Sequence, residues 1–110
     1  MGKNIYKGNV NINKNNRVSW EEKLKDIDEI SGDFSIYAQA KLDNLKTVGG
    51  NLSIGAQAEL DNLETVGGDL YIDVQAKLDN LKTVGGDLSI YARAKLEAPN
   101  LETVEGDLYK

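Results

Sequence analysis

The sequence contains no cysteine and no histidine among its 110 residues. Without cysteine the chain can form neither a disulfide nor a thiolate metal site, and without histidine it lacks the commonest general base and metal ligand. It also lacks an apolar run long enough to cross a membrane as a helix, and its N-terminus has no signal-like apolar segment. We therefore expect a soluble, cytoplasmic protein that uses no metal and no cofactor.

Basic residues are fewer than acidic ones. The chain has 13 lysine and arginine residues against 18 aspartate and glutamate residues, so its net charge is −5. This balance disfavours direct binding to nucleic acid or to an anionic membrane surface. The sequence also shows no paired nucleophile and base and no phosphate-binding loop. We therefore expect that the chain is not an enzyme and that its partner is another protein.

The main feature that the sequence does contain is a tandem repeat of 18 residues. A fixed period near 20 residues is typical of solenoids, in which each repeat forms one coil that packs on its neighbours. We predict one solenoid domain over residues 1–110. Its parts are a cap with a divergent first coil (1–31), four tandem repeats (32–105) and a terminal strand (106–110). The repeats cover residues 32–49, 50–67, 68–85 and, two residues longer, 86–105.

Within one repeat, apolar residues alternate from Leu52 to Leu60 and then recur at every third position, Leu63 and Val66. Alternation predicts an extended segment with one buried face. The Gly67-Gly68 pair is expected to reverse the chain, because glycine tolerates positive φ. The result is an all-β solenoid of about five parallel coils, ~4.8 Å apart. Its sheet face covers residues 33–37, 51–55, 69–73 and 87–91. Its core ladders are Phe34, Leu52, Leu70, Leu88 and Leu108; Ile36, Ile54, Ile72 and Ile90; Leu42, Leu60, Leu78 and Leu96; and Val48, Val66, Val84 and Val104.

Two departures from strict repetition bear on the ends of the solenoid. The segment Ser19-Trp20-Glu21-Glu22 has the pattern of a capping box, which predicts a short helix. We expect Trp20 to cover the first coil, and the alternative is that it anchors a partner. In the fourth repeat, the two extra residues are expected at Ala98-Pro99. The corner asparagines of the four repeats are expected to form a structural ladder: Asn44, Asn62, Asn80 and Asn100.

The string Leu63-Glu-Thr-Val-Gly-Gly-Asp-Leu-Tyr-Ile72 resembles the short leucine-rich repeats of receptor L domains, fungal cell-wall proteins and bacterial repeat proteins. The resemblance implies a solenoid in which one strand of each coil joins a continuous parallel sheet. A left-handed hexapeptide helix is the alternative, because Ile36, Leu42 and Val48 are six residues apart. That fold ranks second, since its third face would bury charged residues such as Lys46.

The candidate binding surface lies on the outward positions of the predicted sheet. Nearly identical repeats differ there: Tyr71 replaces serine in one column, and the next column contains both tyrosine and aspartate. Tyrosine on a rigid face is typical of recognition surfaces, although drift at exposed positions would give the same pattern. An acidic column that starts at Asp33 has either a structural or a ligand-facing role. The predicted protein-binding residues are Asp33, Tyr37, Asp69, Tyr71, Asp73, Asp87, Tyr91, Asp107 and Tyr109.

These features predict a protein-binding module. The alternative is an acidic inhibitor that imitates nucleic acid and blocks a basic nucleic-acid-binding protein, in the manner of anti-CRISPR or anti-restriction proteins. The last coil shows no cap in the sequence, and an open coil end leaves apolar side chains and strand edges exposed. We expect either a partner protein or a second copy to cover it, and the second copy is favoured. The residues of this predicted homodimer contact are Leu101, Val104, Leu108 and Lys110.

Overall fold

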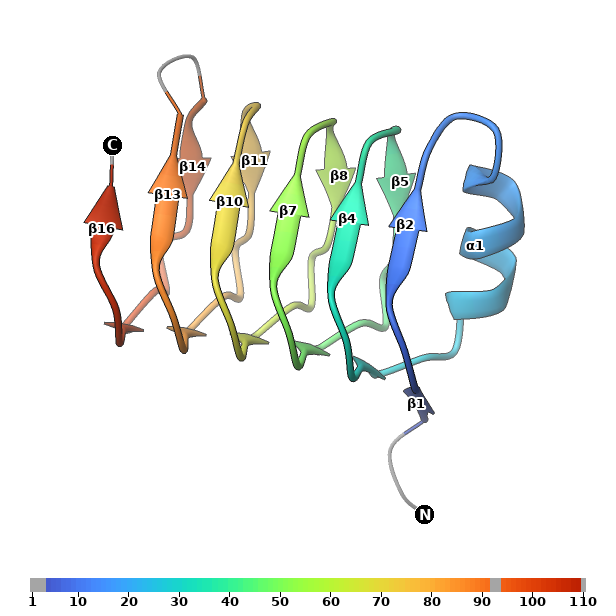
Figure 1. Cartoon of the computed structure of the whole chain (residues 1–110), viewed down its shortest axis with the longest axis horizontal. Helices are drawn as coiled ribbons and strands as arrows, with labels where there is room; N and C mark the ends of the chain where they lie inside the picture. Colours follow the sequence, from blue (N-terminus) through green and yellow to red (C-terminus); the bar gives the residue numbers. More distant parts are fainter. Residues whose placement is uncertain (1–3, 92–93, 110) are drawn as a thin grey trace.

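The computed structural model describes residues 4–91 and 94–109 and is a parallel β-solenoid (Figure 1). Four successive turns each contribute one strand to each of three sheets, which we call A, B and C. A first coil precedes them, in which helix α1 (Arg17–Leu24) replaces the strand of sheet C. The predicted all-β solenoid with an N-terminal helical cap is thus confirmed, and three sheets are present where the resemblance implied one.

The strands are short and follow one another around the coil. Sheet A consists of β1 (Ile5–Tyr6), β3 (Glu29–Ile30), β6 (Thr47–Val48), β9 (Thr65–Val66), β12 (Thr83–Val84) and β15 (Thr103–Val104). Sheet B consists of β2 (Val10–Ile12), β4 (Phe34–Ile36), β7 (Leu52–Ile54), β10 (Leu70–Ile72), β13 (Leu88–Ile90) and β16 (Leu108–Tyr109). Sheet C consists of β5 (Ala40–Lys41), β8 (Ala58–Glu59), β11 (Ala76–Lys77) and β14 (Leu96–Glu97).

The coils wind in a right-handed sense. In Figure 1 the chain rises along sheet B in the foreground, descends along sheet C behind it and returns along sheet A at the lower edge, moving toward the C-terminus with each turn. Right-handed connections are strongly preferred between parallel strands of one sheet, because twisted strands pack back onto the sheet most easily that way. The left-handed alternative therefore does not describe this chain.

The core follows the repeat with little deviation. Leu70 pairs in register with Leu52 and Leu88, and Ile72 pairs with Ile54 and Ile90. Leu70 and Ile72 are both fully buried. Because adjacent coils are parallel and in register, each apolar side chain lies on an equivalent apolar side chain of the next coil. The predicted leucine, isoleucine and valine ladders are confirmed, with one exception in the fourth repeat. Leu108, the last residue of the first ladder, pairs in register with Leu88 but is 53% exposed and does not belong to the core.

The exception arises because the two extra residues of the fourth repeat are not accommodated at Ala98-Pro99. Strand β14 pairs Leu96 with Ala76, and Leu78 donates its backbone N–H to the carbonyl of Glu97. Leu96 therefore takes the place of an alanine, and Ala98 takes the place predicted for Leu96. The additional length lies between β13 and β14. The corner ladder resumes directly after β14, because Asn100 Nδ2 donates to the carbonyl of Asp79 at 2.6 Å.

Helix α1 closes the N-terminal end of the solenoid. Trp20 is half-buried against the core, lies edge-on to Tyr6 with ring centroids 5.4 Å apart, and has Lys23 Nζ 5.1 Å from its centroid. The cap interpretation of Trp20 is therefore supported over the anchor. The capping box was wrong, because the helix begins at Arg17 and Ser19 lies inside it. No helix of the described residues has the length and apolar character that a membrane span requires.

Candidate functional site

The predicted binding surface corresponds to the outward face of sheet B, which faces the reader in Figure 1. In β7 and β10, the first and third residues are buried and the middle residue points outward. The outward column of adjacent strands therefore contains, in order, Asn11, Ser35, Ser53, Tyr71, Ser89 and Tyr109. The fold places these residues on one continuous face, as the alternation predicted.

The acidic column beside this face is a hydrogen-bonded ladder. Asp69 Oδ1 accepts the backbone N–H of Asp87 at 2.8 Å, and Asp87 Oδ1 accepts the backbone N–H of Asp107 at 2.8 Å. The same bond joins Asp33 to Asn51 at 2.9 Å and Asn51 to Asp69 at 2.8 Å. Each side chain thus links its own coil to the next. The structural interpretation of this column holds, and Asp33, Asp69 and Asp87 each use one carboxylate oxygen in it.

The ladder explains the glycine that precedes each of these residues. A Cβ added to Gly86 would lie 2.1 Å from Asp69 Oδ1, and one added to Gly50 would lie 2.3 Å from Asp33 Oδ1. The expected chain reversal through positive φ was wrong, because Gly8 is the only described glycine with positive φ. Glycine is therefore required at these positions because the neighbouring coil leaves no space for a Cβ atom. Sequence reasoning missed this requirement, although the recurrence of glycine at every ladder position was a usable signal.

Two tyrosines are fixed by the remaining carboxylate oxygens. The hydroxyl of Tyr71 donates to Asp69 Oδ2 at 2.9 Å, and the hydroxyl of Tyr109 donates to Asp107 Oδ2 at 3.1 Å. The hydrogen bond to Asp69 is the main cause that raises the pKa of Tyr71, followed by desolvation and by nearby negative charge. The pKa of Tyr109 is raised mainly by its hydrogen bond to Asp107. Each tyrosine ring is thereby held over the strand that carries it.

The other predicted aromatic residues are more exposed. Tyr37 and Tyr91 are 54% and 52% exposed. The ring of Tyr37 lies over Gly55 of the next coil, where an added Cβ would be 2.8 Å from Tyr37 Cδ1. Asp73 is also exposed. Strand β7, with Ser53, separates Asp33 and Tyr37 from the other predicted residues, which lie on or beside β10, β13 and β16. The predicted residues therefore form two unequal parts of one face.

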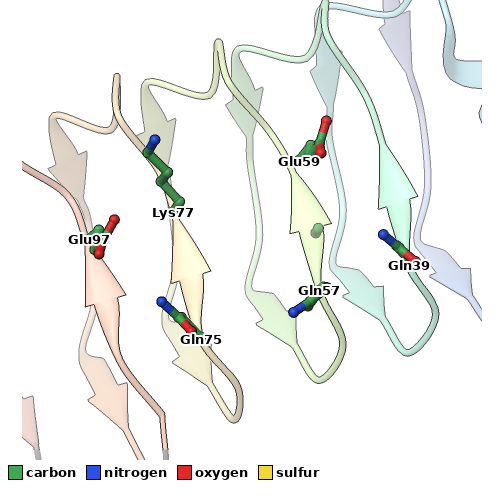
Figure 2. A pocket seen from close by; sticks show the side chains of 7 residues that line it. Gln39, Gln57, Glu59, Gln75, Lys77 and Glu97 are labelled. Carbon is green, nitrogen blue, oxygen red and sulfur yellow. The ribbon is translucent and has the colours of Figure 1, made fainter.

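A second surface feature lies on sheet C and was not predicted (Figure 2). It is a hollow of about 320 Å³ between two rows of outward side chains: Gln39, Gln57 and Gln75 in one row, and Glu59, Lys77 and Glu97 in the other. The charges alternate along the second row. Glu59 Oε2 lies 3.8 Å from Lys41 Nζ in an exposed ion pair. Exposed pairs of this kind contribute ~0–1 kcal/mol. In the sequence these residues occupy the polar positions of the apolar–polar alternation, and this alternation was the signal that could have revealed the surface.

The C-terminal coil is less buried than the coils before it. Leu108 is 53% exposed, and Leu101 and Val104 are half-buried, whereas Leu88 of the preceding coil is 2% exposed. Lys110 lies outside the described residues. Nothing in these contacts tests whether a second copy covers this end, so the homodimer stays a prediction. Among the residues described, no group of three or more acidic side chains is arranged to hold a metal ion.

Neither protein-family models nor curated proteins nor solved structures gave a match to the chain. The described fold is that of a parallel repeat solenoid with an 18-residue period.

Proposed function

We propose that this protein is a non-enzymatic, cytoplasmic protein-binding module that uses the outward face of sheet B. The observation that carries the proposal is the pair of hydrogen bonds that fix Tyr71 to Asp69 and Tyr109 to Asp107. Tyrosine is enriched among residues that dominate binding energy, because it offers a large contact area with few rotatable bonds. A ring that is already fixed loses little further entropy when a partner binds.

The distribution of sequence differences among the repeats also supports this proposal. Core positions are nearly invariant because each must pack against its equivalents in two adjacent coils. The outward column is not under this constraint, and it changes from Ser53 to Tyr71 and back to Ser89. Next to it, Gly55 is replaced by Asp73 and then by Tyr91. A scaffold of invariant coils that presents variable outward residues is how solenoids usually bind proteins.

The proposal is tested by replacing two tyrosines on this face. The wild-type chain and a Tyr71→Ser/Tyr91→Ser variant serve as baits in lysates, with bound proteins quantified by mass spectrometry. A Gln57→Ser/Gln75→Ser variant of sheet C is the matched control, because it removes two exposed side chains from a different face. We expect the tyrosine variant alone to lose its partner while its melting temperature stays close to that of the wild type. Equal capture by all three chains would refute the assignment to sheet B.

An acidic mimic of nucleic acid is the second candidate. It is favoured by the carboxylates of Asp69, Asp87 and Asp107, which lie on three consecutive coils at ~4.8 Å intervals. A mimic should bind a basic groove mainly through charge, so its affinity should fall steeply with salt. A tyrosine-centred interface should depend on salt only weakly. This candidate ranks second because two of the three carboxylates already bond a tyrosine.

We further infer that the repeat is of the leucine-rich type. Three features support this inference: the spacing from Leu63 to Val66, the right-handed winding and the corner ladder (Figure 1). In that ladder, Asn80 Nδ2 donates to the carbonyl of Asp61 at 2.5 Å, and Asn62 donates to the carbonyl of Asp43 in the same manner. Asparagine side chains that satisfy backbone carbonyls at a corner allow the coil to turn without unpaired polar groups.

A further inference from the structure

The C-terminal half of sheet B has a regular arrangement of large and small residues. Tyr71 of β10 and Tyr109 of β16 occupy the same register position, and Ser89 of β13 lies between them. Adjacent strands of a sheet are ~4.8 Å apart, so the two tyrosine positions are ~9.6 Å apart. Tyr91 follows Ser89 at the end of the same strand and is 52% exposed. Tyr71, Tyr91 and Tyr109 therefore lie around the small residue Ser89 on this face.

The carboxylates below these tyrosines are not equivalent. The Oδ2 atoms of Asp69 and Asp107 each accept a hydrogen bond from a tyrosine hydroxyl. Asp87 lies between them in the ladder, and its Oδ1 accepts the N–H of Asp107. No donor among the described residues bonds Asp87 Oδ2. A carboxylate oxygen that lies between two fixed aromatic rings is therefore available to a cationic group of a ligand.

We propose that these residues bind a basic, proline-rich peptide in the polyproline II conformation, running along the solenoid axis. This inference rests on the proposed function and names the chemical class of its partner. A polyproline II helix has three residues per turn and a rise of ~3.1 Å per residue, so it repeats every ~9.3 Å. That repeat matches the ~9.6 Å between the two tyrosine positions. Every third residue of the peptide then meets an equivalent ring.

Other peptide conformations fit this spacing less well. An extended strand repeats its side-chain direction every ~6.8 Å, and two turns of an α-helix span ~10.8 Å. Polyproline II helices also have no internal hydrogen bonds, so carbonyl groups that lose water against the sheet need donors from the protein. Ser89 and Tyr91 lie on this face, and we assign that role to their hydroxyls. Proline rings pack on the tyrosines, and an arginine or lysine of the peptide pairs with Asp87.

The experiment measures binding of labelled peptides of equal length by fluorescence anisotropy. The probes are repeats of Pro-Pro-Arg and of Gly-Gly-Arg, which have the same charge but differ in polyproline II content. We expect the wild-type chain to bind the proline peptide at least about tenfold more tightly, because the ligand is preorganised. Tyr71→Ser/Tyr109→Ser should remove this preference. Tyr37→Ser is the matched control, because Tyr37 lies over Gly55 outside the cluster, and it should keep the preference.

Asp87→Asn provides a second variant that should fold, because Asn51 already occupies the same ladder with its amide oxygen. It should weaken binding of the proline peptide about tenfold through loss of the charged contact. Equal affinity for the two peptides, or a preference retained in the double tyrosine variant, would overturn the inference. The two proposals fail independently. If the proline peptide does not bind the wild type but Tyr71→Ser/Tyr91→Ser loses its partner in lysates, the peptide inference is wrong and the proposed function stands.

Discussion

The hydroxyl of Tyr71 donates a hydrogen bond to Oδ2 of Asp69 at 2.9 Å, while Oδ1 of the same carboxylate accepts the N–H of Asp87 at 2.8 Å. One side chain therefore links two coils and also positions a surface aromatic ring. The same arrangement recurs where Tyr109 bonds Asp107. Because the ladder holds the carboxylate, the ring position depends on the stacking of coils and not on local sequence alone.

The first prediction concerns the ionisation of the tyrosines. The pKa of Tyr71 and of Tyr109 is raised above the ordinary value of 10.0, chiefly by hydrogen bonds to Asp69 and Asp107. Because the folded-state pKa lies above the unfolded value, the stability from each bond is fully present below pH 10 and is lost as pH rises through the raised pKa. A titration that resolves the single tyrosines, such as NMR of ring-labelled protein, should therefore show Tyr71 and Tyr109 ionising above pH 10.

Two variants test the cause of this shift. Asp69→Asn should lower the pKa of Tyr71 toward its ordinary value, because the hydrogen-bonded negative charge is removed. Asp73→Asn removes a charge that is exposed on the same face and does not bond Tyr71, so it is the matched control and should leave the titration unchanged. Ionisation of Tyr71 and Tyr109 at or below pH 10 in the wild type would contradict the prediction.

The second prediction concerns the glycine beside the ladder. In Gly68→Ala the new Cβ would lie 2.3 Å from Asn51 Oδ1 and 2.9 Å from the backbone of Gly50. The neighbouring coil cannot move away locally, so we expect a loss of ~1–3 kcal/mol in the free energy of unfolding. Gly55→Ala is the control: its new Cβ meets chiefly the Tyr37 ring, which can rotate. Chemical denaturation that gave the same loss for both variants would refute this account.

The third prediction concerns the core ladder. Ile72 is fully buried and pairs in register with Ile54 and Ile90. Ile72→Ala leaves a cavity between stacked side chains, and we expect it to lower the free energy of unfolding by ~2–5 kcal/mol. The outward Ser53→Ala should change it by less than ~0.5 kcal/mol. Both values come from chemical denaturation, and a loss below half a kcal/mol for Ile72→Ala would mean that the ladder is not packed as described.

The fourth prediction concerns the C-terminal coil, where Leu108 is 53% exposed. We expect a homodimer in which this coil packs against its equivalent across a two-fold axis, since such dimers are the commonest soluble assemblies. Leu108→Asp should convert the dimer into a monomer in light scattering at tens of micromolar, because it places a charge in the apolar contact. Glu105→Gln, at an exposed position nearby, should leave the mass unchanged. A wild-type chain that is already monomeric would contradict the dimer.

The sequence alone determined the coil period and the core. Alternation from Leu52 to Leu60 decides which side chains face inward, and a slip of one residue would expose every one of them. Repetition after 18 residues then forces equivalent residues to stack, because adjacent coils are parallel. Leu70 and Ile72 were placed correctly for this reason. The outward positions of Tyr71 and Ser89 follow from the same parity.

Only the tertiary structure decided what depends on contacts between coils. Gly68 is small because Asn51 of the preceding coil occupies the adjacent space, and local sequence around Gly68 does not reveal this. Leu96 takes the place of an alanine because the two extra residues of the fourth repeat lie between β13 and β14, and only the pairing between coils shows this. The right-handed winding and the third sheet likewise arise from how strands pack on one another (Figure 1). These contacts join residues 17 to 20 positions apart, a separation at which local propensity has no influence.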